Sequence, residues 1–304
     1  LQKNVAGIKR LFIEEAQGLD NPGLTLKILY DNFKDIRVLA TGSSSFELKN
    51  SLSDALTGRY LDFELTPLSL SEISQKENYK QYIDDMMLFG GFPEVFLERD
   101  ITFKKKLLEK IVESYVFKDI LAFNRIRNAQ AIKELTQAIA YQVGSEVNEN
   151  ELSNRLKIDR KTVLSYLDIL EKSFVIRRVY PFSRNPRREI GRRYKIYFYY
   201  LGLRNALLGD FNPLHIRQDI GALWENFMVI ERYKKMNNTD TKKRQYFWRS
   251  YTGAEVDYIE DQPLSAFEFK YNGTSLTKGS RAFEEVYHTK PKLINKDTLE
   301  VFLY

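Results

Sequence analysis

Short apolar runs separated by polar turns divide the first part of the chain into strands and a helix. Residues 8–13 are predicted to be a short buried strand and residues 36–40 a second strand, and residues 24–33 between them carry apolar side chains at helical spacing. Glu14-Glu15 and Thr41-Gly42-Ser43 follow these two strands directly. Strand, helix and strand with polar residues at the carboxyl ends is the pattern of a parallel sheet, which binds its ligand in the crevice at that edge.

The middle of the chain is predicted to be mostly helical. Apolar residues recur at three-four spacing through residues 103–123, within a helical region that extends over residues 79–140. Residues 147–171 then predict a helix, a short turn and a second helix capped by Asp159, and residues 174–180 alternate as in a strand. This order of elements is typical of a winged helix.

The start of the second helix in this motif carries Arg160, Lys161 and Ser165. In the nucleic-acid interpretation, these exposed side chains contact phosphates or base edges in a major groove of DNA. Winged helices also serve as protein-binding or purely structural modules, and this alternative stays open.

The densest positive stretch of the chain follows. Only one carboxylate interrupts its basic residues, which are Arg177, Arg178, Arg184, Arg187, Arg188, Arg192, Arg193 and Lys195. Arginines around an Asn-Pro turn predict contacts to a phosphate backbone, with binding that depends strongly on salt. A solvated linker is the alternative.

The last third of the chain alternates strands with a helix. Residues 196–200 and 246–249 are predicted to be strands, and residues 222–234 form an amphipathic helix. Two apolar runs then flank Gln262-Pro263, which predicts a β-hairpin, and residues 299–303 are expected to form a late strand. Helix, strand, hairpin and strand in this order resemble the α/β core of restriction endonucleases.

The hairpin carries Asp257, Glu268 and Lys270. Because successive side chains of a strand point to opposite faces, Glu268 and Lys270 share a face, and Asp257 joins them if the partner strand is in register. Two carboxylates favour Mg²⁺, and a nearby ammonium stabilises developing phosphate charge or helps a water lose its proton. The residues resemble the Asp…Glu-x-Lys core of PD-(D/E)XK nucleases, which implies that Glu225 on the preceding helix completes the metal site. An ordinary solvated face is the alternative.

Composition sets the broad class. The 304 residues suffice for two to three compact units, and 43% hydrophobic with 29% charged content is typical of a globular protein. We find no apolar run of about 20 residues in the sequence, so we expect a cytosolic protein that does not bind membranes. The absence of Cys excludes disulfides and thiolate zinc, and His215 and His288 form no metal-binding pair. A formal charge of +6 permits an anionic partner such as DNA.

The first two strands resemble the Walker B and sensor-1 strands of an AAA+-type P-loop ATPase. More specifically, the chain resembles a bacterial and archaeal family in which such an ATPase core is fused to a C-terminal domain of unknown function. The further segments that carry this resemblance are residues 56–59, 63–72, 90–93, 194–198, 201–205 and 221–226.

This resemblance implies ATP and Mg²⁺ as cofactors. Glu14 would take the place of the Mg²⁺-associated Asp, Glu15 that of the water-polarising Glu, and Thr41 or Ser43 that of sensor 1. Arg59 would serve as an arginine finger, and since such fingers act across subunit boundaries, the resemblance also implies a homo-oligomer. For Glu14 and Glu15 alone, charge compensation at a helix N-terminus is the alternative.

The sequence contains no Gly-x-x-x-x-Gly-Lys-Ser/Thr loop to hold the β- and γ-phosphates. Either that loop lies upstream of Leu1 or the chain is an inactive nucleotide fold. We expect the first, because about ten residues are too few for a strand, loop and helix before the Walker B-like strand.

The predicted fold class is a multidomain α/β protein. It combines part of a P-loop ATPase parallel sheet (residues 1–72), a helical lid (73–128), a winged helix (129–183) and a restriction-endonuclease-like domain (184–304). Three functional hypotheses stay open at this point: an ATPase that acts on or near DNA, a Mg²⁺-dependent DNA nuclease, and a non-catalytic module that binds DNA or protein. The sequence names no protein partner.

Overall fold

The computed structural model describes residues 8–42, 56–74, 78–119, 126, 128–183, 193–241 and 243–304. The chain divides into two compact units, one with Leu1–Glu64 and Ile169–Phe174, the other with Leu65–Asp168 and Val175–Tyr304. Among the described helices, none combines the length and apolar character that a membrane span requires.

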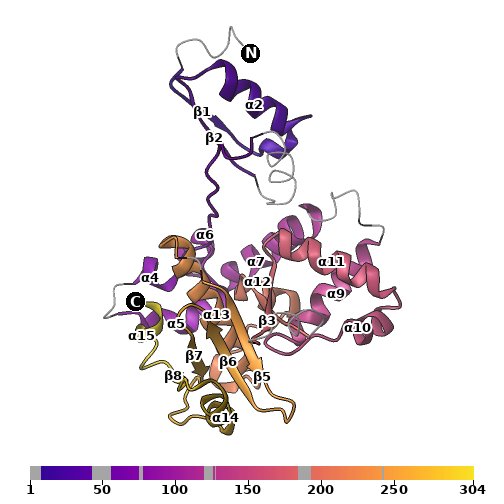
Figure 1. Ribbon diagram of the computed structural model, residues 1–304. Coiled ribbons are helices and arrows are strands. Elements are labelled where there is room, and N and C mark those ends of the chain that lie inside the picture. Colours follow the sequence, from indigo (N-terminus) through magenta and orange to yellow (C-terminus); the bar gives the residue numbers. More distant parts are fainter. Residues whose placement is uncertain are drawn as a thin grey trace. The chain divides into compact units, whose positions relative to one another are not determined.

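The first unit contains a pair of parallel strands. Strands β1 (Arg10–Ile13) and β2 (Arg37–Ala40) pair in parallel with Ile13 opposite Ala40, and α2 (Pro22–Asn32) connects them (Figure 1). Asn21 caps α2 by accepting the backbone N–H of Leu24 at 3.0 Å. Leu26 and Leu29 of α2 are buried with Leu56, which confirms the predicted strand, helix and strand. The predicted burial of the first strand is wrong, because only one face of β1 packs on this core and Phe12 on the other face is 69% exposed.

The second unit begins with a segment that a long helix far along the chain holds in place. In helix α4 (Leu70–Ile73), the first N–H donates to the buried Glu231 carboxylate at 2.6 Å. Lys234 donates to the carbonyl oxygen of Leu68 at 3.0 Å and pairs with Glu231 at 2.7 Å. Glu231 and Lys234 belong to α13 (Ile220–Asn238), so the segment with Leu68 and the buried Ser69 and Leu70 is fixed to this helix.

Helices follow, as the periodicity predicts. They are α5 (Lys80–Phe89), α6 (Pro93–Leu97) and α7 (Ile101–Ile111), which continues as a π-helix over Val112–Asp119. Helix α12 (Leu201–Leu208), which was not predicted, packs against α5. Helices α5 and α12 approach so closely that a Cβ atom on Gly202 would lie 2.0 Å from the Phe89 carbonyl oxygen. Only glycine fits at this crossing.

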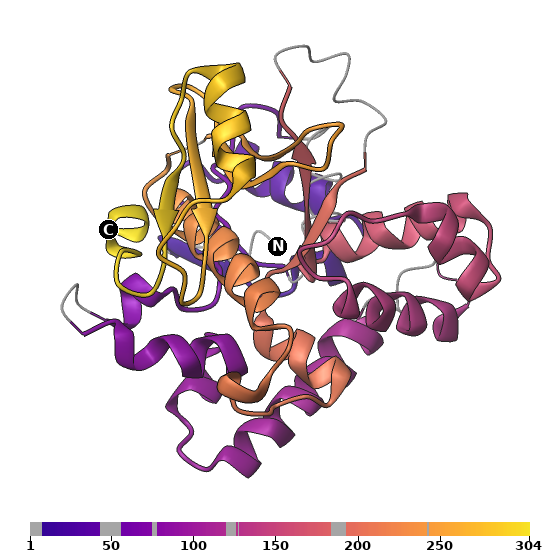
Figure 2. The same ribbon diagram turned by 90° about the horizontal axis from the view of Figure 1, so that it is seen from below.

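A group of three helices leads into a strand pair. The helices are α9 (Ala129–Tyr141), α10 (Glu149–Leu156) and α11 (Arg160–Lys172), and in Figure 2 they lie together at one side of the sheet. Asp159 caps α11 as predicted, since its carboxylate accepts the Thr162 N–H at 3.0 Å. Strands β3 (Ile176–Pro181) and β4 (Lys195–Phe198) then pair antiparallel.

These two strands belong to one six-stranded sheet in the order β4-β3-β5-β6-β7-β8. The remaining strands are β5 (Gln245–Arg249), β6 (Glu255–Glu260), β7 (Ser265–Phe269) and β8 (Lys292–Ile294). Strands β5, β6 and β7 form an antiparallel meander, and α14 (Lys278–Tyr287) leads to β8, which runs parallel to β7 (Figure 1). The predicted hairpin is therefore confirmed as β6 and β7.

The late strand predicted at residues 299–303 is wrong. Residues Glu300–Leu303 form helix α15, and β8 is the last strand among the described residues. The Asn295 side chain accepts the Thr298 N–H at 3.1 Å, and this turn starts the helix. Leu299, Phe302 and Leu303 are all buried, at the three-four spacing of a helix face.

Candidate functional site

The carboxyl ends of β1 and β2 meet in the first unit. Thr41 donates its N–H to the Ile13 carbonyl oxygen at 2.8 Å, and the N–H of Ala16 donates to the Thr41 carbonyl oxygen at 2.8 Å. These two bonds hold Glu14 and Glu15 beside Thr41, at one edge of the parallel pair. Both glutamates are exposed there.

Glu15 has an unusual backbone conformation. Its φ of 47° and ψ of 50° lie in the left-handed region, where a residue with a Cβ costs about 1–2 kcal/mol. Gln17 donates a side-chain hydrogen bond to the Glu15 carboxylate. The left-handed backbone at Glu15 therefore bends the chain sharply after β1. Together with the bond from Gln17, it sets the direction of the Glu15 side chain.

Arg59 is described, whereas Ser43 lies outside the described residues. The guanidinium of Arg59 pairs with Asp31 at 3.2 Å and lies 5.6 Å from the Tyr30 ring centre. Its side chain is 47% exposed, which leaves it accessible to a second molecule.

A cluster of carboxylates forms in the second unit, and α13 contributes Glu225 to it. The next residue, Asn226, is fully buried and accepts the Phe198 N–H at 2.7 Å while donating to the Phe198 carbonyl oxygen at 2.9 Å. Phe198 lies in the edge strand β4. Asn226 thus fixes α13 to this strand and sets the position of Glu225.

Strand β4 supplies the donors to Glu225. Lys195 and Tyr197 are two residues apart in the strand and point to the same face. The Lys195 ammonium donates to Glu225 Oε1 at 2.7 Å, and the Tyr197 hydroxyl donates to the same oxygen at 2.6 Å. The Lys195 side chain is only 2% exposed.

Strand β6 supplies the other two carboxylates. Glu255 accepts a hydrogen bond from Lys195, and Asp257 accepts the Phe269 N–H from β7 at 2.7 Å. Ligand oxygens of Glu225, Glu255 and Asp257 all lie within 4.8 Å of one another. The structure therefore brings two residues predicted as metal ligands, Glu225 and Asp257, into one cluster.

Burial and charge set the protonation of this cluster. Burial raises the pKa of Asp257 to about 7, and the Glu225 carboxylate acts in the same direction. Burial opposes the charge of Lys195, but Glu225 and Glu255 outweigh it and raise the pKa of the ammonium above its ordinary value. Burial, and then Glu225, also raise the pKa of Tyr197, so its hydroxyl stays a donor.

Glu268 is not part of this cluster of three carboxylates. Its Oε2 atom accepts hydrogen bonds from the start of α14, namely from the Thr277 N–H at 3.2 Å, the Thr277 hydroxyl at 3.0 Å and the Ser280 hydroxyl. Its other oxygen pairs with Lys270 at 3.3 Å. Glu268 thus anchors α14 to β7, and a role for Glu268 and Lys270 at a metal stays a prediction.

The cluster does not fit a divalent cation as the chain presents it. Mg²⁺ requires oxygen ligands at about 2.0–2.1 Å in near-octahedral geometry. Glu225 Oε1 already accepts two hydrogen bonds, and the Lys195 ammonium lies between Glu225 and Glu255. An ammonium from the chain takes the position in which a metal would compensate these charges.

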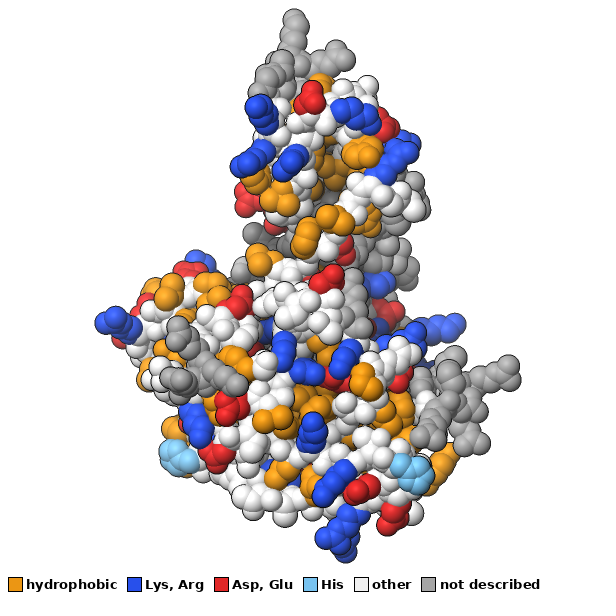
Figure 3. Space-filling model, turned by 60° about the vertical axis from the view of Figure 1, so that its left-hand side comes forward, with side chains coloured by type: hydrophobic (Ala, Val, Ile, Leu, Met, Phe, Trp, Pro, Cys, Tyr) orange, Lys and Arg blue, Asp and Glu red, His pale blue; other side chains and the backbone are white. Residues whose placement is uncertain are grey.

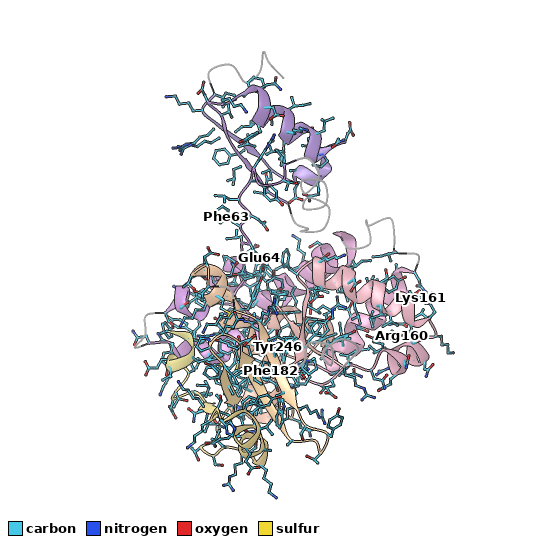
Figure 4. All side chains as sticks on the ribbon, viewed as in Figure 1. Phe63, Glu64, Arg160, Lys161, Phe182 and Tyr246 are labelled. Atoms are coloured by element: carbon cyan, nitrogen blue, oxygen red, sulfur yellow. The ribbon has the colours of Figure 1, made fainter. Side chains whose placement is uncertain are left out.

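The residues predicted to bind nucleic acid fall into two groups. Lys161 and Ser165 are exposed near the start of α11, where Arg160 pairs with Glu149. Arg160 and Lys161 lie on the side away from the six-stranded sheet (Figure 4). Arg178 instead pairs with Asp168. Arg177 donates to Gln245 at 2.9 Å, and its guanidinium lies 4.2 Å from the Tyr233 ring centre.

Arg177 and Arg178 therefore have structural partners inside this unit. Arg187 and Arg188 lie outside the described residues. On the face drawn in Figure 3, Lys and Arg side chains are interspersed with Asp and Glu side chains and do not form one continuous basic patch. Among the described residues that were predicted to bind DNA, those at the start of α11 are thus the accessible ones.

Two residues of the carboxylate cluster escaped the sequence-based prediction. Glu255 lies two residues before Asp257, and this spacing places both on one strand face, so the pattern could have identified it. Lys195 was grouped with the basic stretch. Its position at the start of a wholly buried strand was the feature that distinguished it from that stretch.

Family models match three consecutive parts of the chain. Residues 1–74 match an AAA domain, residues 80–214 match a Domain of unknown function (DUF8612) and residues 220–302 match a Domain of unknown function (DUF4143). The chain thus carries an AAA domain region at its N-terminal end. This confirms the AAA part of the predicted resemblance and makes nucleotide binding possible for the protein; the winged helix and the nuclease-like domain stay predictions.

The curated relatives are uncharacterized proteins. One from Methanocaldococcus jannaschii is 24% identical over 93% of this chain and 66% of its own length. Others from Mycobacterium bovis and Mycobacterium tuberculosis are each 26% identical over 89% of this chain and 60% of their length. The chain thus spans about 60–66% of these relatives. No solved structure matches the chain.

Proposed function

We propose that this chain belongs to an ATP-hydrolysing AAA protein that acts on DNA, and that it supplies the Walker B and sensor-1 strands. The observation that carries the proposal is the pair of backbone hydrogen bonds between Thr41 and the end of β1, at 2.8 Å each, within the region that matches an AAA domain. They support a shared nucleotide-facing edge for Glu14, Glu15 and Thr41.

Each residue has a distinct role in this proposal. Bound Mg²⁺ would neutralise charge on the phosphates, and Glu14 would help to hold it. Glu15 orients the attacking water and accepts its proton, and the left-handed backbone at this residue fixes its direction. The Thr41 side chain would contact the terminal phosphate, and the exposed Arg59 would act on a nucleotide bound to a neighbouring subunit.

The test is ATP hydrolysis by the full-length protein of the natural reading frame, measured as phosphate release. Glu15→Gln removes the base but keeps the shape of the side chain, so we expect kcat to fall by about 100-fold or more while ATP still binds. Asp20→Asn, an exposed acidic residue that does not adjoin the strand end, is the matched control. Hydrolysis by Glu15→Gln at the wild-type rate would overturn the proposal.

The DNA part of the proposal rests on α10 and α11. Three helices followed by an antiparallel strand pair support the winged-helix prediction, and Lys161 and Ser165 are exposed at the start of the second helix of the pair. The strand pair is also part of the six-stranded sheet, so the proposed DNA-binding module and the C-terminal α/β domain share one sheet.

Part of the C-terminal domain supports the predicted nuclease-like core. Helix α13 and the β5-β6-β7 meander follow in the predicted order of helix, strand and hairpin, whereas the last strand is β8, after α14, and not residues 299–303. The ammonium of Lys195 inside the carboxylate cluster does not favour metal-dependent hydrolysis, so we assign this domain a binding or structural role in the ATPase.

A further inference from the structure

We infer that the Lys195 ammonium is the resident cation of the Glu225, Glu255 and Asp257 cluster, so that the wild-type cluster excludes divalent cations and acquires a site for them only when this ammonium is removed. The inference does not depend on ATP hydrolysis. It concerns only the second unit of the chain.

The contacts of Lys195 define its position in the cluster. Three elements converge on the cluster: α13 brings Glu225, β6 brings Glu255 and Asp257, and β4 brings Lys195. The ammonium bonds to both Glu225 and Glu255, whose ligand oxygens lie within 4.8 Å of each other and of Asp257. A cation inside the cluster is thus already part of the fold.

Lys195 and a divalent cation compete for the same oxygens. A hard cation in this cluster would lie among the oxygens of Glu225, Glu255 and Asp257, where Glu225 Oε1 already accepts the ammonium at 2.7 Å and the Tyr197 hydroxyl at 2.6 Å. Two positive charges inside one buried cluster of carboxylates repel each other strongly. Metal binding therefore requires the ammonium to leave.

The fold holds Lys195 in the cluster. Its side chain is 2% exposed, and its ammonium lies 5.3 Å from the Phe247 ring centre. One edge of β4 pairs with β3, and the other edge is covered by Asn226 and by residues 144–147, which bond to Ile196 and Tyr194. These bonds fix the backbone of Lys195, and the burial of its side chain with its bonds to Glu225 and Glu255 keeps the ammonium in the cluster.

Other charges around the cluster do not change this conclusion. Arg249 lies 3.5 Å from Glu255 and 3.4 Å from Glu146 at the half-exposed rim, so it compensates one carboxylate from outside. Lys270 pairs with Glu268 at 3.3 Å. Among the described residues, only Lys195 bonds to two members of the cluster.

Mn²⁺ titration followed by calorimetry tests the inference. Lys195→Met keeps the length and apolar stem of the side chain but removes its charge, so we expect this variant to bind one Mn²⁺ at least about tenfold more tightly than wild type. Mn²⁺ should also raise the Tm of this variant and leave that of wild type unchanged. The double variant Lys195→Met/Asp257→Asn should lose this higher affinity for Mn²⁺. That loss would show that the ion binds at the carboxylate cluster.

Two results would overturn the inference. The first is Mn²⁺ binding by wild type that Asp257→Asn abolishes, and this titration does not depend on any Lys195 variant. The second is a folded Lys195→Met that gains no affinity. If Lys195→Met does not fold without metal, Lys195→Gln, whose neutral amide can still donate to Glu225, takes its place and keeps all three carboxylates, with the same gain over wild type expected.

Discussion

The carboxamide of Asn226 bonds to both backbone groups of Phe198, at 2.7 Å to the N–H and 2.9 Å to the carbonyl oxygen. Asn226 therefore replaces a neighbouring strand at the edge of the sheet, where unpaired backbone groups would otherwise be buried. The same contact fixes the adjacent Glu225, so the edge of the sheet and the carboxylate cluster depend on one side chain.

Asn226→Ala should lower the free energy of unfolding by about 2–4 kcal/mol, because two buried backbone groups lose their partners. Urea denaturation followed by circular dichroism measures this change. Asn150→Ala, at an exposed position of α10, is the matched control and should change the free energy of unfolding by no more than about 0.5 kcal/mol. Equal effects of the two substitutions would contradict the role assigned to Asn226.

Asp257→Asn should change how stability depends on pH. The Asp257 pKa of about 7 lies above its ordinary value of 3.8, so the folded protein holds this proton when the unfolded chain has lost it. Wild type therefore loses stability as pH rises from about 4 to about 7, whereas Asn keeps the hydrogen bond to Phe269 without titrating. In EDTA, the free energy of unfolding of Asp257→Asn minus that of wild type should rise by about 2–4 kcal/mol between pH 4 and pH 8.

The measurement is the difference in unfolding free energy between Asp257→Asn and wild type across this pH range. Because all other titrating groups are common to both proteins, they largely cancel in the difference. A difference that does not change with pH, or that shrinks as pH rises, would show that Asp257 is ionised throughout in the folded protein.

Gly279→Ala should disturb the carboxylate cluster through the backbone. A Cβ atom at Gly279 would lie 2.1 Å from the Glu255 carbonyl oxygen, so α14 must move away from β6. We expect a loss of about 2 kcal/mol or more in the free energy of unfolding, because the backbone of α14 or of β6 must shift to relieve the clash. Gly221→Ala in the first turn of α13 has open space around its Cβ and should be neutral or slightly stabilising.

Lys161→Ala should weaken binding of duplex DNA and reduce the dependence of log K on log salt by about one, because one phosphate contact is lost. Fluorescence anisotropy at several salt concentrations measures both quantities. Lys290→Ala removes an exposed lysine far along the chain, after α14, and should leave both unchanged. If the two variants lost affinity equally, DNA would be held by general charge and not by α11.

Sequence patterns predict the local elements of this protein well. Alternation and turn residues predict the β6-β7 hairpin, and Asp159 marks the start of α11, because these features depend on neighbours in the chain. The parallel pairing of β3 with β5 brings Tyr180 opposite Tyr246, residues far apart in the sequence. No local pattern in the sequence indicates such a contact. The sequence therefore did not predict that β3 and β4 belong to the same sheet as β5 to β8.

The same limit explains the candidate site. Glu225 and Asp257 were identified because the resemblance to PD-(D/E)XK nucleases implies a carboxylate on the hairpin and one on the preceding helix. Lys195 belongs to a run of basic residues that predicts a surface, and only the burial of β4 on both faces places its ammonium inside the cluster. Glu268 shows the reverse, since its strand position suited a metal while the start of α14 provided its partners.

The buried contacts of Leu68 and Leu70 with Lys234 and Glu231 have a consequence for dissecting the protein. A C-terminal fragment that starts after Ser74, where the AAA match ends, would leave Glu231 and Lys234 in a hollow without their backbone partners. A fragment that starts at Leu65 keeps them. The end of the sequence match to an AAA domain and the best start for a stable C-terminal fragment therefore lie at different residues.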